Sequence, residues 1–400
     1  MRRSIVVAAL GTSQTLAWAS TYYVPAILAE PIARDIGITQ AVFFGVFSAS
    51  LLLSAALGPM VGRRIDLVGG RGMLAWSNLV IALGLALLGM TQNLATLMLA
   101  WGVLGIGMAM GLYDPAFAAL ARLYGSDARG AITGVTLFAG FASTIGWPVS
   151  AYLAGTIGWQ DTCFVWAALH IVLGLPLNRL VLPTPPQHAT EVAPIAAAIG
   201  RPAASESKAG EAGEGAAAPA PPYAMAVLAF VFAATWFVTA ALAAHLPTLF
   251  RLCGATQEAA IAAAALVGPA QVAARLVEFS LLRRVHPLVS ARLAAVLHPI
   301  GAALLAALGA PAASLFAMLH GAGNGMLTIA KGTLPLALFG PAGYGHRSGL
   351  LSVPARGTQA AAPFLFGLVL EVWGPLPGLA LTTGLTLSAL LALFALRARR

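Results

Sequence analysis

Charged side chains are scarce in this chain. Only 9% of its 400 residues are Asp, Glu, Lys or Arg, whereas 59% are hydrophobic. A soluble domain carries about 25% charged residues, so these are too few to cover a surface that faces water. Apolar runs of about 20 residues, the length that crosses a bilayer, recur along nearly the whole chain. The runs lack the ten-residue alternation of a membrane β-barrel. We therefore predict an all-α membrane protein that crosses the bilayer many times.

Cysteines and catalytic motifs are scarce as well. The two cysteines, Cys163 and Cys253, have no spacing typical of a ligand set or a redox pair. The histidines His170, His298 and His320 are scattered singly, which favours packed or hydrogen-bonded rings over proton carriers. No nucleotide-binding loop, metal cluster or catalytic triad is visible. The sequence therefore indicates neither an ATP-driven pump nor an enzyme, and we expect no cofactor and no metal.

The net charge of +9 would fit a nucleic-acid partner, but the basic residues are placed differently. With twelve spans and both termini cytoplasmic, 17 of the 22 Lys and Arg residues fall in inside loops or tails or at the cytoplasmic ends of spans. Only Arg34 and Arg251 fall outside. This asymmetry follows the positive-inside rule. It predicts a multi-pass protein of a bacterial-type cytoplasmic membrane, with the lipid bilayer and no nucleic acid as partner. The expected spans are 5–28, 41–61, 72–90, 94–121, 130–152, 162–182, 224–247, 258–281, 289–309, 312–337, 348–371 and 376–396.

A change of composition divides the chain. Residues 183–222 hold eight of the 25 prolines together with Ala, Gly, Ser and four glutamates, and they show no apolar periodicity. Such a segment cannot bury a core and is typical of a disordered linker. We predict an N-terminal six-helix half over 1–182, a cytoplasmic linker over 183–222, and a C-terminal six-helix half over 223–400.

Two glycine-laced apolar stretches, 105–125 and 321–340, resemble each other. Each carries one ionisable residue at nearly the same offset, the acid Asp114 in the first and the base Lys331 in the second. A charge is costly in hydrocarbon, so such a residue is a functional candidate. We expect the pair to meet across the two halves when the cytoplasmic side closes, and to part when it opens, which would also switch the proton affinity of Asp114. The alternative is that each charge is satisfied within its own half.

The segment Gly62-Arg63-Arg64-Ile65-Asp66-Leu67-Val68-Gly69-Gly70-Arg71 resembles the signature loop of the major facilitator superfamily. The resemblance implies two pseudo-symmetric six-helix halves, a small-molecule substrate, a monomer, and transport by alternating access. Gly62, Arg63, Asp66 and Arg71 are then gating candidates. Asp66 would meet helix N-terminal amides and an arginine, a charge-assisted contact that breaks when the halves rock. Leu67 replaces the family's second arginine. A plain cytoplasmic hairpin is the alternative.

The second half repeats this segment at an offset of 212, as Ala274-Arg275-Leu276-Val277-Glu278 followed by Arg283. The arginine and glutamine that many drug exporters of the superfamily carry in helix 4 are missing from Trp101–Gly107. In helix 8, Gln271 and Arg275 share one face, and this pair resembles the monocarboxylate and oxalate porters, in which the arginine holds the substrate carboxylate. A guanidinium suits a carboxylate because its planar fork bonds both oxygens. Alternatively, Arg275 is only the loop arginine of the second half.

Three further positions complete the predicted substrate site. Tyr22 and Tyr23, two residues before Pro25, are similar to helix 1 of the same branch, although the branch's helix-1 lysine is absent. Arg356, with Gln359 one turn later, could bind an anion or extend to the inner surface. We therefore expect a secondary transporter of a small organic anion, with proton symport as one form of coupling. A drug or metabolite efflux antiporter and a transporter-like membrane sensor are the alternatives.

Overall fold

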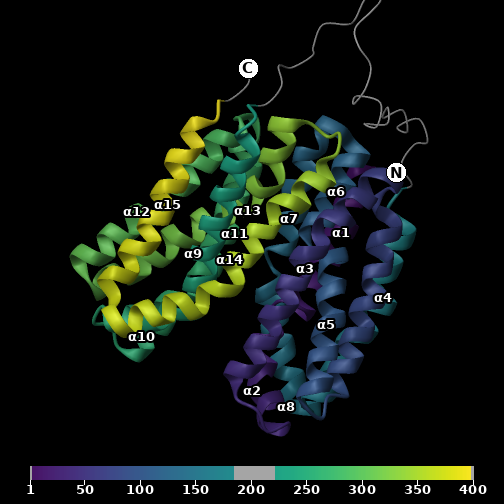
Figure 1. Cartoon of the computed structure of the whole chain (residues 1–400), viewed down its shortest axis with the longest axis horizontal. Coiled ribbons are helices and arrows are strands. Elements are labelled where there is room, and N and C mark those ends of the chain that lie inside the picture. Colours follow the sequence, from purple (N-terminus) through teal and green to yellow (C-terminus); the bar gives the residue numbers. More distant parts are fainter. Residues whose placement is uncertain (1, 184–220, 398–400) are drawn as a thin grey trace, which may run out of the picture.

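The computed structural model describes residues 2–183 and 221–397, and every regular element in these ranges is a helix. The predicted all-α membrane fold is thereby confirmed. Almost all of the predicted linker lies outside the described residues, and the division of the chain into domains stays a prediction. Figure 1 shows the described helices as two groups lying side by side.

The first group runs from α1 to the helical turns that follow α8. Its elements are α1 (Arg3–Ser20), α2 (Pro25–Asp35), α3 (Gln40–Val68), α4 (Gly70–Gly89), α5 (Leu94–Gly111), α6 (Tyr113–Tyr124), η1 (Gly125–Asp127), α7 (Ala128–Ala139), α8 (Ala142–Leu169), η2 (His170–Gly174) and η3 (Leu177–Val181). Within α8, Gly158 has φ of 85° and kinks the helix between two of the expected spans.

The second group runs from α9 to α15. Its elements are α9 (Ala224–Leu252), α10 (Gln257–Ala265), α11 (Val267–Ser280), η6 (Leu282–Arg284), α12 (Pro287–Leu308), η7 (Ala310–Ala312), α13 (Ala313–Phe339), α14 (Tyr344–Trp373) and α15 (Pro375–Ala395). The helices α13 and α14 contain internal prolines yet run continuously for 27 and 30 residues.

The first span is broken where a continuous helix over 5–28 was expected. The chain leaves α1 after Ser20 and re-enters a helix at Pro25, which occupies the first turn of α2. Proline has no N–H to donate to the carbonyl of Thr21, and its ring clashes there, so the helix breaks. Tyr22 and Tyr23 therefore lie in the break between α1 and α2.

The signature segment is helical and not a loop, which corrects the expected end of the second span at 61 and the start of the third at 72. The helix α3 continues to Val68, because Gly69, with φ of 88°, alone turns the chain into α4. Gly62, Arg63 and Asp66 therefore project from the last two turns of α3. Arg122 of α6 donates to the carbonyls of Asp66 and Leu67 and caps this end.

Seven helical stretches in the described ranges are long and apolar enough to cross a membrane. One of them, Leu94–Val181, covers three expected spans because short helical turns join its parts. The expected spans 5–28, 312–337 and 348–371, which are not among the seven, correspond to α1 with α2, to α13 and to α14. These helices bring polar and charged residues to the middle of the molecule.

Buried apolar side chains form separate cores in the two groups. The largest core lies among the helices of the first group and Leu182, which follows them, and from the second group it includes Leu336 and Tyr344. The other cores lie among α9 to α15. In Figure 1 the two groups meet at the end where α1 begins and α15 ends, and they diverge toward α2 and α10. We call the first of these the terminal end.

Candidate functional site

An ion cluster lies between the two groups of helices. Lys331 Nζ is 3.0 Å from Asp114 Oδ1, and an Arg356 nitrogen is 3.5 Å from Asp114 Oδ2. The Ser352 hydroxyl donates to Asp114 Oδ2 at 2.8 Å. Only 11% of the Asp114 side chain, 8% of Lys331 and 9% of Arg356 are exposed. Asp114 of the first group is thus held by three side chains of the second.

Local sequence explains why Asp114 points across the interface. Pro115 cannot donate to the carbonyl of Gly111, so the helix stops at Gly111 and restarts as α6 at Tyr113. Asp114 then lies in the first turn of α6, where free N–H groups favour a negative charge. Close helix packing brings Lys331 within reach, because a Cβ on its neighbour Gly332 would collide with Phe117 and Ile132.

Side chains beside this cluster complete its surroundings. The Lys331 ammonium lies 5.3 Å from the centre of the Trp236 ring, a cation–π distance. Ser352 lies one helical turn before Arg356 on α14, so both face Asp114. Trp236 and Ser352 were not among the site residues predicted from the sequence. The i, i+4 spacing to Arg356 was a signal for Ser352, whereas nothing in the sequence marked Trp236.

Aromatic residues of the broken first span extend the site. The side-chain amide of Gln359 donates to the Tyr22 hydroxyl at 2.6 Å, which joins α14 to the break after α1. The rings of Tyr22 and Tyr23 lie edge to face at 5.5 Å. The Tyr113 ring packs against Trp18 at 4.8 Å. The structure therefore brings Tyr22, Tyr23 and the arginine-bearing helix α14 to one place.

Arg275 is a further charge at the interface, and it differs from the three of the ion cluster. Its side chain is buried, with 5% of the residue exposed, and its Nε has no hydrogen-bond partner. The guanidinium donates to the Thr136 carbonyl at 3.3 Å and to Gln271 Oε1 at 3.4 Å. It also lies against the backbone of Gly140 on the opposite group, where a Cβ would collide with it.

The balance of charge at the interface is positive. Among the described residues, no carboxylate lies within ion-pair distance of Arg275. Asp114 is shared between Lys331 and Arg356. A buried ion without a counter-ion is costly, and three cations here face one carboxylate. Such a site can bind an anion, because the anion would supply the missing counter-charge.

Asp66 forms the first of two contacts between the groups at the terminal end. Its Oδ1 accepts from the N–H of Gly345 and its Oδ2 from the N–H of His346, both at 2.8 Å. Both donors lie in the first turn of α14, so a carboxylate of one group caps a helix of the other. Gly62 and Gly345 let the backbones of α3 and α14 touch, since a Cβ on either would collide with the other's carbonyl. We call this the amide contact.

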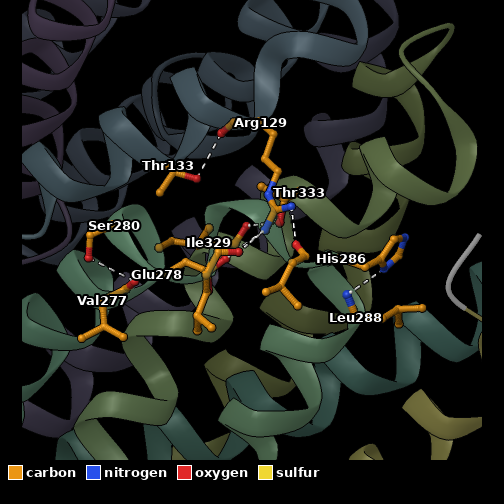
Figure 2. A network of polar contacts seen from close by, with 11 residues as sticks. Arg129, Thr133, Val277, Glu278, Ser280, His286, Leu288, Ile329 and Thr333 are labelled. Carbon is orange, nitrogen blue, oxygen red and sulfur yellow. Dashed lines mark hydrogen bonds and ion pairs between the residues drawn. The ribbon is translucent and has the colours of Figure 1, made fainter. Parts of the chain in front are cut away.

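The second contact joins Arg129 at the start of α7 to Glu278 near the end of α11 (Figure 2), with 3.3 Å between nitrogen and oxygen. Arg129 also donates to the carbonyls of Val285 and Leu282, at 2.5 and 3.1 Å. Glu278 is 2% exposed. We call this the ion-pair contact. Arg129 was not a candidate in the sequence, although Glu278 matched Asp66 at the offset of 212.

The other signature residues lie apart from these contacts. Arg63 is exposed on the last turns of α3. Arg71 donates from its Nε to the Arg179 carbonyl at 2.7 Å, which ties α4 to the end of η3 within the first group. The predicted gating roles of Gly62, Arg63, Asp66 and Arg71 stay predictions. Both cysteines are free, and in the described residues no group of three or more His, Cys, Asp or Glu could hold a metal.

Two bundles of membrane-spanning helices that enclose a charged, polar site at their interface define a membrane transporter. The chain belongs to the Major Facilitator Superfamily, whose family model matches residues 10–356. The resemblance seen in the signature segment is thereby confirmed, and the protein is a multi-pass membrane transporter, not an enzyme.

Relatives in sequence cover part of the chain. The "Probable nitrate transporter NarT" of Staphylococcus epidermidis is 25% identical over 162 residues, which are 40% of this chain and 41% of the relative. The protein of the same name from Staphylococcus carnosus is 24% identical over 167 residues, or 41% of this chain and 42% of the relative. The chain thus spans less than half the length of these curated relatives.

Solved structures cover nearly all of it. The human organic anion transporter MFSD10 (TETRAN) aligns with a TM-score of 0.72 at 16% identity, over 98% of this chain and 100% of that chain. FucP in the outward conformation aligns with a TM-score of 0.70 at 14% identity, over 97% of this chain and 98% of that chain. The proton:xylose symporter XylE aligns with a TM-score of 0.70 at 11% identity, over 98% of this chain and 96% of that chain. At these identities the likeness concerns the fold alone.

Proposed function

We propose that this protein is a secondary transporter of small planar oxyanions, with Arg275 as the principal anion-binding group. The observation that carries the proposal is the buried Arg275 guanidinium, whose Nε has no partner and which no described carboxylate neutralises. Carboxylates and nitrate are both planar and accept two parallel hydrogen bonds from a guanidinium. The two sequence relatives are named probable nitrate transporters, which supports the anion class.

The remaining site residues have supporting roles in this proposal. Gln271 orients the guanidinium through its side-chain oxygen. Tyr22 and Tyr23 form the aromatic wall of the binding site, and Gln359 fixes the Tyr22 hydroxyl. Arg356 adds positive charge from α14. The protein acts as a monomer by alternating access. Its terminal end lies in the cytoplasm of a bacterial-type cell, because most of the basic residues belong to that side.

The proposal predicts a strong loss of anion affinity in Arg275→Lys, because an ammonium cannot reproduce the bidentate fork. We expect at least about a tenfold weaker Kd, equal to about 1.4 kcal/mol. Binding of nitrate, formate, acetate and oxalate to purified protein would be measured by thermal shift, since a ligand of the native state raises its stability. Arg34→Lys, whose side chain is 72% exposed, is the control and should bind normally.

Equal affinity in the Arg275→Lys variant would leave Arg275 a structural charge. The panel also distinguishes nitrate from the carboxylates, because the preferred anion gives the largest thermal shift. Flux of the same anions into proteoliposomes then separates a transporter from a membrane sensor, which binds without moving its ligand. Flux of hydrophobic cations with no effect of these anions would favour a drug exporter.

We further propose that the Asp114–Lys331 pair is a gate between the halves that can couple transport to protons. The pair joins α6 to α13 across the interface. Asp114→Lys and Lys331→Asp should each abolish anion flux, because each places like charges together in a buried site. The double swap should recover only part, since Lys at position 114 would still face Arg356. A double variant as inactive as the singles, together with full activity of Asp114→Asn, would exclude the gate.

A further inference from the structure

Two histidines that lie far from the anion site form a buried pair inside the second group of helices. His298 of α12 and His320 of α13 face each other with 3.2 Å between their Nδ1 atoms. They are 4% and 5% exposed. Phe316 stacks parallel to His320 and meets the edge of His298, which holds both rings in place. Because two bare nitrogens would repel each other at this distance, one Nδ1 carries a proton and donates it to the other.

The outer nitrogen of the pair is unsatisfied. His298 Nε2 is buried and has no hydrogen-bond partner. Both rings line a cavity enclosed by α9, α12, α13 and α15, whose polar wall is formed by Thr235, Thr239, Asn324 and Thr386. A buried polar atom without a partner is unfavourable, and a cavity with several polar groups can hold water that satisfies it. The cavity therefore offers room for water beside the two rings.

The cavity lies on the side of α13 that leads to the anion site. Residues 320, 324 and 331 of this helix share one face, because 3.6 residues make one turn. Asn324 accepts from the Thr239 hydroxyl at 2.9 Å, and neither residue is fully buried. Lys331, two turns beyond Asn324, holds Asp114. Polar residues on this face of α13 thus extend from the histidine pair toward the interface between the two groups.

In the ranges that the structure describes, no charged side chain forms a hydrogen bond or ion pair with either histidine, and this includes Arg122 of α6 and His346, Arg347 and Glu371 of α14. The charged and titratable residues on the helices that line the cavity are His245, Arg251, Arg292 and Lys331. His245 contacts the Pro363 carbonyl, and Arg292 donates to carbonyls at the end of α15. On helices packed against α13, Asp114, Arg129, Arg275, Glu278 and Arg356 belong to the contacts described above, and Glu258 is exposed. None of these contacts either histidine.

We propose that His298 and His320 form a proton-binding site, which takes up one proton from water in the adjoining cavity. The incoming proton binds the free ring nitrogen, and the existing N–H···N bond keeps the two rings together while the pair becomes singly positive. A metal is a poorer occupant, since protein metal sites use three or four ligands and no third His, Cys, Asp or Glu joins the pair among the described residues. The role of the site as a proton carrier rests on the proposed transport function, whereas proton binding itself does not.

The test is a titration of the full-length protein in detergent, without anion, by NMR of ¹⁵N-labelled histidine. His298→Gln and His320→Gln assign the two rings. We expect the resonances of the pair to move together as pH falls below about 6.5, the ordinary range of histidine, and each single variant to change the signal of the remaining partner. His170 is the internal control, because it is fully buried with both ring nitrogens bonded, to Ser20 and Asn78. Its resonances should stay fixed.

Signals of His298 and His320 that stay unchanged down to the pH of unfolding would overturn the proposal. The proposal would also be overturned if, in a variant that lacks one ring, the remaining ring titrated with the same curve as in the wild type. Proton flux in proteoliposomes adds a functional readout, in which His298→Gln should move fewer protons per anion at unchanged anion affinity. Anion binding by thermal shift tests the anion site separately, so either proposal can fail without the other.

Discussion

The two contacts at the terminal end use acids at equivalent positions in different ways. Asp66 and Glu278 are related by the offset of 212 and lie near the ends of α3 and α11. Asp66 binds two backbone N–H groups of α14, whereas Glu278 binds the side chain of Arg129 on α7. The positions correspond, but one partner is a helix end and the other a long, charged side chain.

Glycine explains the difference. At the amide contact, Gly62 and Gly345 let two helix backbones touch, so a short aspartate reaches the free N–H groups directly. At the ion-pair contact, the corresponding residue of the repeat is Ala274 instead of glycine. A longer acid and an arginine then span the larger separation. The amide contact therefore depends on the absence of side chains, and the ion-pair contact depends on their presence.

The largest effect is expected at the amide contact from Gly62→Ala. The new Cβ would collide with the backbone carbonyl of Gly345, which cannot move as a flexible side chain could. The halves should fail to close at this end, and anion flux in proteoliposomes should fall at least about tenfold, equal to about 1.4 kcal/mol. Gly45→Ala, on the same helix in open space, is the matched control. Normal flux in Gly62→Ala would show that α3 and α14 do not need this close approach.

A smaller effect is expected at the ion-pair contact from Arg129→Met. The variant leaves Glu278 buried without its counter-charge, which destabilises the protein. Because 23% of the Arg129 side chain is exposed and water screens its charge, we expect a loss of about 1 kcal/mol. The conformer with this end closed should be destabilised, which thermal unfolding in detergent would report as a lower midpoint. Glu278→Gln should cost less, because Arg129 is 23% exposed and keeps its bonds to two carbonyls. The reverse order of the two variants would contradict this account.

The fold was largely predictable because its determinants are local and repetitive. Apolar runs of bilayer length, the basic residues beside them, and the signature segment predicted the helices and the family. Helix ends were less predictable. The break at Thr21 depends on Pro25, and the continuation of α3 to Val68 depends on a single glycine that turns the chain. Both depend on single residues that also occur within uninterrupted helices, as Pro335 does in α13.

Residues of the candidate site could be singled out where charge stood out in an apolar setting, as for Asp114, Lys331 and Arg275, which the structure places between the two groups. Residues that depend on tertiary neighbours were missed. Arg129 looked like one basic residue among many at a helix start, and its partner Glu278 lies almost 150 positions later. The histidines His298 and His320 looked isolated, because the 22 positions between them hide the fact that neighbouring helices bring their rings together.

The smallest effect is expected from pH, and it should be greater at the ion-pair contact than at the amide contact. His286, in the connection before α12, caps that helix by accepting the Leu288 N–H at its Nδ1, 3.2 Å away, and it lies beside the contact (Figure 2). Burial, and then the positive charges of Arg129 and Arg292, lower the pKa of His286 below its ordinary value. The folded protein therefore favours the neutral form of His286. The stabilisation is present above about pH 6.5 and is lost as pH falls from there.

Protonation of His286 removes the cap and adds a positive charge next to Arg129, so acid should weaken the ion-pair contact more than the amide contact. Cysteine pairs placed across each contact in a Cys163→Ser/Cys253→Ser background would report closure as crosslinking by a bifunctional reagent at pH 5 to 8. His286→Asn keeps a capping oxygen but cannot titrate in this range, so it should flatten the pH dependence at the ion-pair contact. The change should be small, since His286 is partly exposed and water screens its charge. An unchanged pH dependence in His286→Asn would assign the titration to another group.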